Sequence, residues 1–277
     1  MAEFDELVKA RFGTDGDTPS PPAGEEVLKT ILAHRTYRRY SDEPVDGALL
    51  ELLLACALSA PAKSDLMQFS VIHVTDAGKK SRLAELSNTS WIATAPVVLL
   101  FCGDTGRNRS ITRARGYEYA QNTLDSFFNA AVDTALVMQN FTIAAEAAGL
   151  GCCYVSQVRL HLDEVGELFS LPEGVFPVCG LTAGWPGEER DTTYRIPPEV
   201  SVHHDVYSSE GLADSMDGYD ARRNRQRPTP PEKQMYREHY GEAGNYGWSE
   251  NTARRLSRPD GLSPMRAFLA RQGFDLA

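Results

Sequence analysis

The sequence lacks the long apolar run that crossing a membrane would require. Its most apolar helical stretch, residues 130–148, is interrupted by Asp133, Gln139, Asn140 and Glu146. The first 17 residues carry charged side chains where a signal peptide needs an apolar segment. We therefore expect a chain that is neither exported nor inserted into a membrane.

Cysteine is scarce and basic charge is in deficit. The five cysteines are odd in number, show no CxxC spacing and lie among apolar residues. They predict buried, reduced thiols and a reducing compartment, the cytoplasm. The formal net charge of -10 argues against a long-range field that attracts nucleic acid or anionic lipid. A site for an anion must then be local.

Motifs of a self-sufficient catalytic side chain are also missing. The sequence has no GxSxG, no HExxH, no Walker loop and no GxGxxG after a strand. His203, His204 and Asp205 are metal-binding residue types, but neighbours on an extended chain point to opposite sides, so we expect no metal site. If the protein is an enzyme, a bound cofactor is the expected source of its chemistry.

Hydrophobic spacing predicts a mixture of helices and short strands. Helices are expected over 25–33, 46–58, 129–148, 249–256 and 263–272, and strands over 69–75, 96–102, 152–156 and 178–183. The branched apolar runs 69–75 and 96–102 are expected at the centre of the sheet. The polar, proline-containing stretch 217–233 predicts an extended excursion. This pattern suggests an N-terminal helix and linker over 1–24, a core over 25–207 and a C-terminal excursion with helices over 208–277.

Basic residues gather in one short segment, His34-Arg35-Thr36-Tyr37-Arg38, directly after a predicted helix. Guanidinium groups make charge-assisted, bidentate hydrogen bonds to phosphate oxygens, and a threonine hydroxyl adds a neutral donor. The alternative is a solvated basic turn that pairs with Asp42 and Glu43. The segment by itself does not choose between the two interpretations.

Motifs elsewhere favour the phosphate site, because their order resembles the nitroreductase superfamily, in particular its NADPH-dependent nitroreductase and flavin reductase branch. HRTYRRYSDEPV over 34–45 resembles the opening motif of this family, and APAKSDLMQF over 60–69 resembles its second flavin loop. Trp91 with Ala95-Pro96, GLGCCYV over 149–155, GWP over 184–186 and Arg195-Ile196-Pro197 follow in order. The resemblance covers residues 25–207, and the end of the chain is similar as well.

The resemblance implies an α+β, nitroreductase-like fold with a central mixed or antiparallel sheet surrounded by helices. It also implies a domain-swapped homodimer with two FMN sites at the interface. Residues that match phosphate and ribityl contacts are His34, Arg35, Thr36, Arg38 and Arg195. Residues that match contacts to the flavin ring are Ser64, Asp65 and Gln68 of the partner subunit, with Tyr154, Val155, Ser156 and Gln157 beside N5.

The implied activity is hydride transfer from NADH or NADPH through FMN to a small electron-poor acceptor, a nitroaromatic, quinone or flavin, by a ping-pong mechanism. The alternatives are a specialised flavin-processing or reductive dehalogenating relative, and a flavin-binding protein without nicotinamide turnover. Asp65 and Met67 depart from the usual Asn and Gln of the flavin loop. Residues 241–247 lack the arginines that NADPH-preferring members place there, which leaves both nucleotides as candidates.

Overall fold

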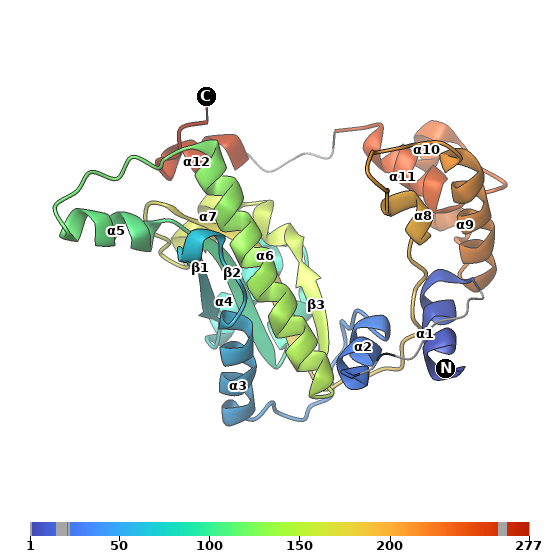
Figure 1. Ribbon diagram of the computed structural model, residues 1–277, viewed down its shortest axis with the longest axis horizontal. Coiled ribbons are helices and arrows are strands. Elements are labelled where there is room, and N and C mark those ends of the chain that lie inside the picture. The colour runs from blue at the N-terminus through green and yellow to red at the C-terminus, as the bar shows by residue number, and fades with distance from the viewer. Residues whose placement is uncertain (1, 15–20, 22, 260–264, 277) are drawn as a thin grey trace. The chain divides into compact units, whose positions relative to one another are not determined.

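The computed structural model describes residues 2–14, 21, 23–259 and 265–276 (Figure 1). The chain divides into two compact units, which we call the helical unit (Met1–Ala33 and Asp191–Gly261) and the sheet unit (His34–Arg190 and Leu262–Ala277). Of the predicted linker over 14–24, residues 15–20 and 22 lie outside the described residues.

The sheet unit is built on a four-stranded antiparallel sheet in the order β1-β2-β4-β3. The strands are β1 (Phe69–His73), β2 (Val97–Asp104), β3 (Gly151–Val155) and β4 (Val175–Gly184), in the four predicted places. The expectation that β1 is central is wrong, because β1 forms one edge of the sheet while β2 and β4 form its centre. Branched apolar residues indicate covered faces, and an edge strand can have covered faces too.

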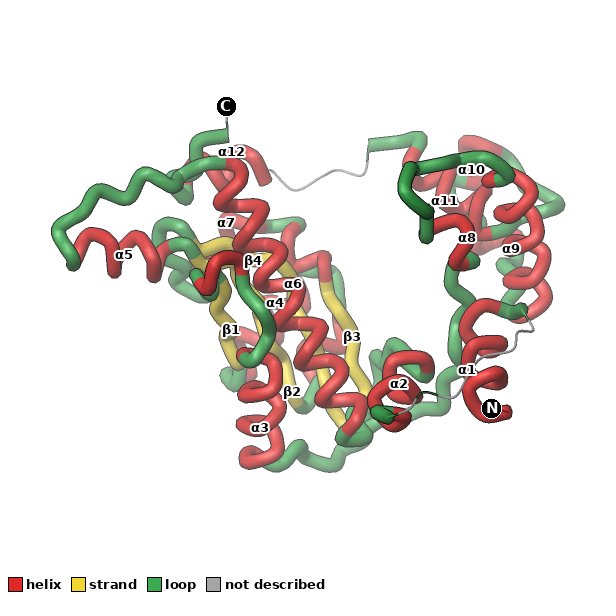
Figure 2. Tube along the Cα trace, viewed as in Figure 1, coloured by secondary structure: helices red, strands yellow, loops and turns green. Residues whose placement is uncertain are grey.

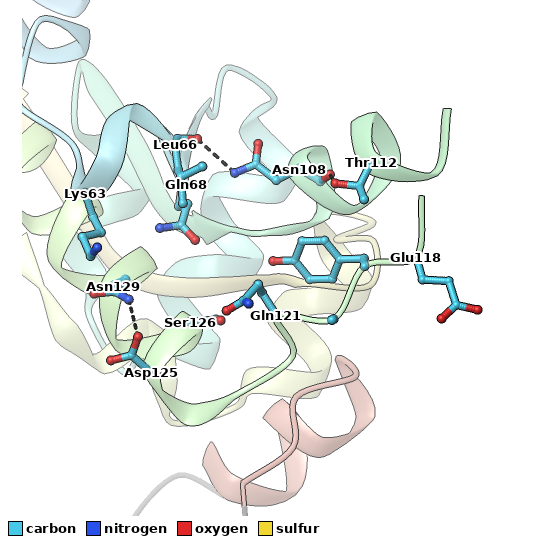
Figure 3. Close-up of a pocket in the computed structure, with 12 residues that line it drawn as sticks. Lys63, Leu66, Gln68, Asn108, Thr112, Glu118, Gln121, Asp125, Ser126 and Asn129 are labelled. Carbon is cyan, nitrogen blue, oxygen red and sulfur yellow. Dashed lines mark hydrogen bonds between the residues drawn. The ribbon is translucent and has the colours of Figure 1, made fainter. Parts of the chain in front are cut away.

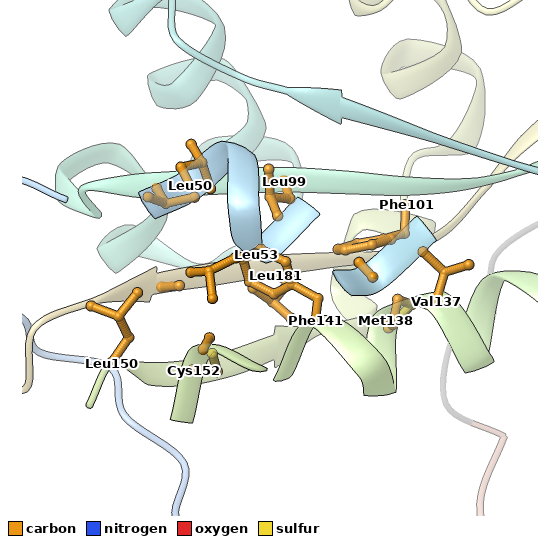
Figure 4. Packing of buried hydrophobic residues seen from close by; sticks show 14 of the residues in the cluster. Leu50, Leu53, Leu99, Phe101, Val137, Met138, Phe141, Leu150, Cys152 and Leu181 are labelled. Carbon is orange, nitrogen blue, oxygen red and sulfur yellow. The ribbon is translucent and has the colours of Figure 1, made fainter. Parts of the chain in front are cut away.

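Alternating side chains of β2 point into two separate cores. Leu99 and Phe101 join Phe141 and Leu181 in a core beneath the helices α3 (Gly47–Leu58) and α6 (Leu124–Ala147), as Figure 4 shows. Val98 and Leu100 join the core formed with α4 (Ala77–Leu86) and α7 (Leu162–Leu168). Helices therefore cover both faces of the sheet (Figure 2), and the α+β class expected from the sequence is confirmed.

Helix α6 is the long buried helix of the unit. It begins at Leu124, five residues before the predicted start, because the Thr123 hydroxyl accepts a hydrogen bond from the backbone N–H of Ser126 (3.3 Å). It ends as predicted before Gly149, whose φ of 88° lies in the left-handed region. Residues such as Phe141 and Val137 are fully buried on its inner side.

The segment that follows the C-terminal helix α12 (Met265–Arg271) packs against a buried arginine of the sheet unit. Arg109 of α5 (Gly106–Ala114) is 2% exposed and pairs with Glu173 at 2.7 Å. Its guanidinium lies 5.1 Å from the ring of Phe274, which packs with Phe127 and Phe176. This contact fixes the end of the chain against the N-terminal part of α6.

The helical unit corrects one sequence prediction. Its helices are α1 (Ala2–Phe12), α2 (Glu25–Leu32), α8 (Pro198–Ser201), α9 (Leu212–Gln226), α10 (Arg237–Tyr240) and α11 (Trp248–Leu256). The predicted excursion over 217–233 is wrong up to Gln226, because α9 buries Tyr219 against Trp248 at a ring distance of 5.8 Å. The carboxylate of Asp220 accepts the backbone N–H of Ser249, at 3.1 Å and 3.2 Å, in the first turn of α11.

The cysteines only partly match expectation. Cys102, Cys152, Cys153 and Cys179 are buried and unpaired, but Cys56 is exposed on the outer side of α3, where helical spacing alone does not specify which face is covered. Burial raises the pKa of Cys102 to about 12 and that of Cys179 to about 11. No described helix combines the length and the apolar character that spanning a bilayer takes.

The contact of Asp220 with α11 predicts a local effect on stability. Asp220→Ala removes the acceptor for an N–H at the start of α11, which should cost about 0.5–2 kcal/mol and speed hydrogen exchange of the α11 backbone amides. Asp217→Ala, an exposed carboxylate on the same helix, is the matched control. Equal exchange of α11 in the two variants would contradict the assigned role.

Candidate active site

The basic segment, which we define as residues 34–41, is fixed by backbone hydrogen bonds to one edge of the sheet. Thr36 forms a parallel bridge with Cys152 of β3, and the N–H of Tyr37 donates to the carbonyl of Cys152 at 2.9 Å. Farther along, Tyr40 forms an antiparallel bridge with Pro186, just beyond β4. The candidate phosphate ligands of this segment thus rest on strands rather than on a free loop.

Two side chains of the basic segment reinforce this attachment. The hydroxyl of Tyr40 lies 2.7 Å from that of Thr182 on β4, and burial raises the pKa of Tyr40, which keeps the phenol neutral. Nδ1 of His34 lies 2.6 Å from a carboxylate oxygen of Glu146 in the last turn of α6. The segment is therefore held to the sheet through Thr36, Tyr37 and Tyr40 and to α6 through His34.

A hollow of about 910 Å³ opens beside the basic segment. Its wall contains the cations Arg38, Arg39 and Arg190, and Arg38 lies 5.5 Å over the ring of Trp91. The indole N–H of Trp91 is buried and has no hydrogen-bond partner within the described part of the chain. Burial raises the pKa of the adjacent Cys153 thiol, and the charge of Arg38 opposes that rise. The wall thus combines three guanidinium groups with an aromatic ring.

The residues expected beside flavin N5 follow the same strand edge. Tyr154 and Val155 end β3, and Ser156 and Gln157 begin the short 3-10 helix η3 (Ser156–Arg159). Burial raises the pKa of Tyr154 to about 12, and its hydroxyl lies 2.7 Å from that of Thr142. Because Thr36 is paired in parallel with Cys152, the basic segment and Tyr154–Gln157 run together along one edge.

The other expected ring contacts belong to the ring-side loop, which we define as residues 63–68. Three of its residues have positive φ without being glycine, namely Ser64 (51°), Asp65 (57°) and Met67 (48°). Asn108 donates a hydrogen bond from its side chain to the carbonyl of Leu66 at 3.0 Å, and Arg107 donates to the carbonyl of Met67. Positive φ is unfavourable for residues other than glycine, so hydrogen bonds from the surrounding protein stabilise this conformation of the loop.

A buried carboxylate closes the ring-side loop. Asp133 of α6, 1% exposed, accepts the backbone N–H of Lys63 at 2.8 Å and that of Gln68 at 3.2 Å. In the sequence, Asp133 is evident only as a charged interruption of an apolar helix. The signal that could have identified it was its position on the buried face, where an ionised side chain needs partners.

The ring-side loop borders a pocket of about 440 Å³ (Figure 3). Gln68 contributes a side chain that is 3% exposed, and its Nε2 has no hydrogen-bond partner among the residues described. Asn108 of helix α5, Tyr119 of the segment before α6 and Ser126 of the first turn of α6 belong to the opposite wall.

One copy of the chain does not bring all the expected site residues together. The ring-side loop precedes β1, whereas the basic segment lies on β3 at the opposite edge of the sheet. Three strand spacings separate β1 from β3, or about 14 Å. Arg195 belongs to the helical unit, where it is exposed and donates a hydrogen bond to the hydroxyl of Thr193 at 3.2 Å.

Comparison with known proteins identifies the family. The sequence model of the nitroreductase family matches residues 31–185, and that of the nitroreductase family C-terminal domain matches residues 194–277. The chain belongs to the nitroreductase family. The resemblance of its motifs is therefore confirmed.

Named relatives of this nitroreductase-family chain act on flavins and nitro compounds. It is 35% identical to an FMN reductase [NAD(P)H] of Bacillus subtilis over 200 residues, which cover 70% of this chain and 80% of the relative. It is 34% identical to an oxygen-insensitive NADPH nitroreductase of Salmonella typhimurium over 181 residues, or 65% of this chain and 74% of that protein.

Solved structures of the nitroreductase family have the same fold. NfrA2 of B. megaterium matches with a TM-score of 0.81 at 30% identity, over 91% of this chain and 99% of that one. The NADPH:FMN oxidoreductase of Vibrio harveyi, complexed with NAD+, matches with a TM-score of 0.77 at 27% identity, over 90% and 98% of the two chains. The expected nitroreductase-like fold is confirmed.

The donor set of the hollow fits the phosphate end of a flavin mononucleotide. Arg38 and Arg190 offer charge-assisted hydrogen bonds, although Arg190 also lies 3.6 Å from Glu188, and Ser41 and Ser90 offer hydroxyls. The acidic side chains on the same wall, Asp42 and Glu188, leave an excess of positive charge, because Arg39 adds a third guanidinium. A dianionic phosphate monoester has the charge and the acceptors that this wall lacks.

The close packing of Tyr37 on β3 predicts the effect of one added methyl group. In Gly151→Ala the new Cβ would lie 2.5 Å from Cδ2 of Tyr37, so the basic segment must shift, at a cost of about 1–3 kcal/mol. Gly47→Ala, where no heavy atom lies within 4 Å of the added Cβ, is the control and should be neutral or slightly stabilising. Thermal unfolding of the two variants compares them, and equal midpoints would refute the packing constraint.

Proposed function

We propose that this chain is an FMN-dependent oxidoreductase that transfers hydride equivalents from NADH or NADPH to a small electron-poor acceptor, such as a nitroaromatic, a quinone or a flavin. The observation that carries the proposal is the cationic hollow on the β3 edge of a nitroreductase-family sheet. The names of relatives, FMN reductase and NADPH nitroreductase, support the same chemistry. When bound, FMN supplies the redox step, and both substrates use it in turn by a ping-pong mechanism.

In this proposal the residues of the chain bind and orient the cofactor. Arg35, Thr36 and Arg38 hold the phosphate and ribityl groups, with His34 contributing a backbone contact. The β3 edge, through Tyr154, Val155, Ser156 and Gln157, faces the N5 side of the ring. Arg195 is a second phosphate ligand, and Ser64, Asp65 and Gln68 approach the ring from a second copy of the chain. The hydrogen bonds of Tyr37 and Tyr40 to the sheet support this arrangement, because they fix the anchor before the cofactor arrives.

The second copy in the proposal is a homodimer partner. One support for this partner is that the anchor and the ring-side loop lie at opposite edges of the sheet within one copy. An apolar stripe on α6 supports a shared interface, because its side chains recur every fourth residue and are exposed in the single chain: Leu124 (53%), Phe128 (62%), Val132 (40%) and Leu136 (39%).

The proposal assigns a role to each of three parts of the chain and a cellular location to the protein. Residues 25–207 carry the FMN site, residues 208–277 clasp the partner by domain swapping, and residues 1–24 form an N-terminal extension. Cytoplasmic localisation is part of the proposal. Its support is that four unpaired thiols are buried, as expected for a protein that works under reducing conditions.

The cofactor proposal is tested by the spectrum of the purified protein. The protein should be yellow and should release FMN, not FAD, in acid. Arg38→Ala should raise the dissociation constant for FMN about tenfold or more, because it removes a charge-assisted contact of about 1.5–3 kcal/mol. Riboflavin, which has no phosphate, should be affected much less, and Arg113→Ala, an exposed cation on α5, should affect neither. A colourless protein that takes up no FMN would sink the proposal.

We expect weak discrimination between NADPH and NADH from the charges in one loop of the helical unit. Residues 241–247 contain no cation, and the nearby Arg237 is paired with Glu242 at 2.8 Å, which leaves little charge for a 2′-phosphate. The ratio of kcat/KM for the two nucleotides should stay below about a hundredfold. Glu242→Gln should free Arg237 and raise the preference for NADPH several-fold, whereas Glu238→Gln should not. A preference above about a hundredfold in the unmodified enzyme would show that another cation meets the phosphate.

A further inference from the structure

The ring-side loop depends on one carboxylate of α6. Asp133 accepts the N–H groups at both ends of the loop, from Lys63 and Gln68, while the residues between them include Ser64, Asp65 and Met67 with positive φ. A buried carboxylate is unfavourable unless hydrogen bonds satisfy it, and such charge-assisted bonds are strong. Loop and carboxylate therefore stabilise each other, and the closed loop is the form that Asp133 favours.

The closed loop turns the side chain of Gln68 into the 440 Å³ pocket (Figure 3). The backbone N–H of Gln68 is the one held by Asp133, its side chain is 3% exposed, and its Nε2 has no hydrogen-bond partner within the described ranges. Leaving a buried amide donor unsatisfied is costly. An oxygen atom of a ligand in the pocket would satisfy it.

Neighbouring groups narrow the chemistry of that ligand. The amide of Asn129 already donates to Asp125 at 2.8 Å, and the amide of Asn108 already donates to Leu66 at 3.0 Å. Among the described residues of the pocket wall, Lys63 is the one cation, against the two carboxylates of Glu118 and Asp125. This balance disfavours an anion. The pocket therefore suits a neutral molecule with an exposed oxygen acceptor.

We propose that Gln68 is a specificity-determining residue that donates a hydrogen bond to the carbonyl or nitro oxygen of a neutral electron acceptor, and that Asp133 is the positioning residue that holds it there. The proposal rests on the proposed function. A quinone becomes a hydroquinone by gaining two electrons and two protons. NAD(P)H supplies a hydride through the flavin, which accounts for both electrons and one proton, and water supplies the second proton. Negative charge grows on the quinone oxygen as electrons arrive, and a fixed amide donor stabilises that charge.

The test compares an electron acceptor that should need the hydrogen bond from Gln68 with one that should not. The holoenzyme is first reduced with NAD(P)H and then mixed in a stopped-flow instrument with benzoquinone or with ferricyanide, which takes single electrons without entering a pocket. Rates are expressed per bound flavin. Gln68→Leu and Asp133→Asn should each slow the quinone reaction about tenfold relative to ferricyanide. The controls Gln226→Leu and Asp163→Asn repeat these changes at exposed positions and should leave the ratio unchanged.

A double variant tests whether Asp133 acts through Gln68. If it does, Gln68→Leu with Asp133→Asn should be no slower toward benzoquinone than the slower single variant, because the contact can be lost only once. Asp133→Ser, which keeps one acceptor oxygen, replaces Asp133→Asn if the latter does not fold. Additive losses would overturn the positioning role.

Two further outcomes would overturn the proposal. An unchanged quinone rate in Gln68→Leu would mean that the pocket does not hold the acceptor. Equal losses with quinone and ferricyanide in both Asp133 variants would mean that Asp133 serves only the fold. Failure of the proposed function itself is seen earlier and separately, since the unmodified protein would then bind no FMN, or its flavin would not bleach with NAD(P)H.

Discussion

Two carboxylates on the buried helix α6 hold the two halves of the candidate site. Glu146, near the end of the helix, pairs with His34 of the basic segment, and Asp133 closes the ring-side loop. At 1.5 Å per residue the two attachment points are about 20 Å apart along the helix axis. Because α6 packs rigidly on the sheet through residues such as Phe141, neither half can move toward the other without disrupting the core.

This separation connects the fold to the proposed chemistry. In the proposed function, a second copy supplies the ring-side loop to each anchor, because the two lie at opposite edges of one sheet. The same helix that separates the halves exposes an apolar stripe that includes Phe128 and Val132. A two-fold axis near this stripe would bring each anchor toward the loop of the other copy, with a single interface serving two sites.

The sequence predicted the parts of the site that depend on local pattern. We could predict the basic segment, the four strands and the glycine after α6. The patterns that indicate them, namely charge clusters, branched apolar runs and helix caps, each span only a few consecutive residues. The role of Asp133 in holding the ring-side loop could not be predicted from the sequence, because its partners Lys63 and Gln68 lie far away in the chain. The helix α9 was missed for a similar reason, because Tyr219 and Asp220 pack on and hydrogen-bond to residues of α11 that lie 29 residues farther along the chain. Long-range pairing of polar groups leaves little trace in a single sequence.

Mixed dimers test the shared site most directly. Arg38→Ala damages the anchor and Asp133→Ala damages the ring-side loop, so each homodimer should turn over quinone poorly. If sites are shared, a heterodimer isolated by two different tags contains one site with an intact anchor and an intact loop, and should recover about half of the unmodified turnover per dimer. If each chain forms its own site, every site in the heterodimer is damaged. Turnover no higher than the mean of the two homodimers would then contradict the account.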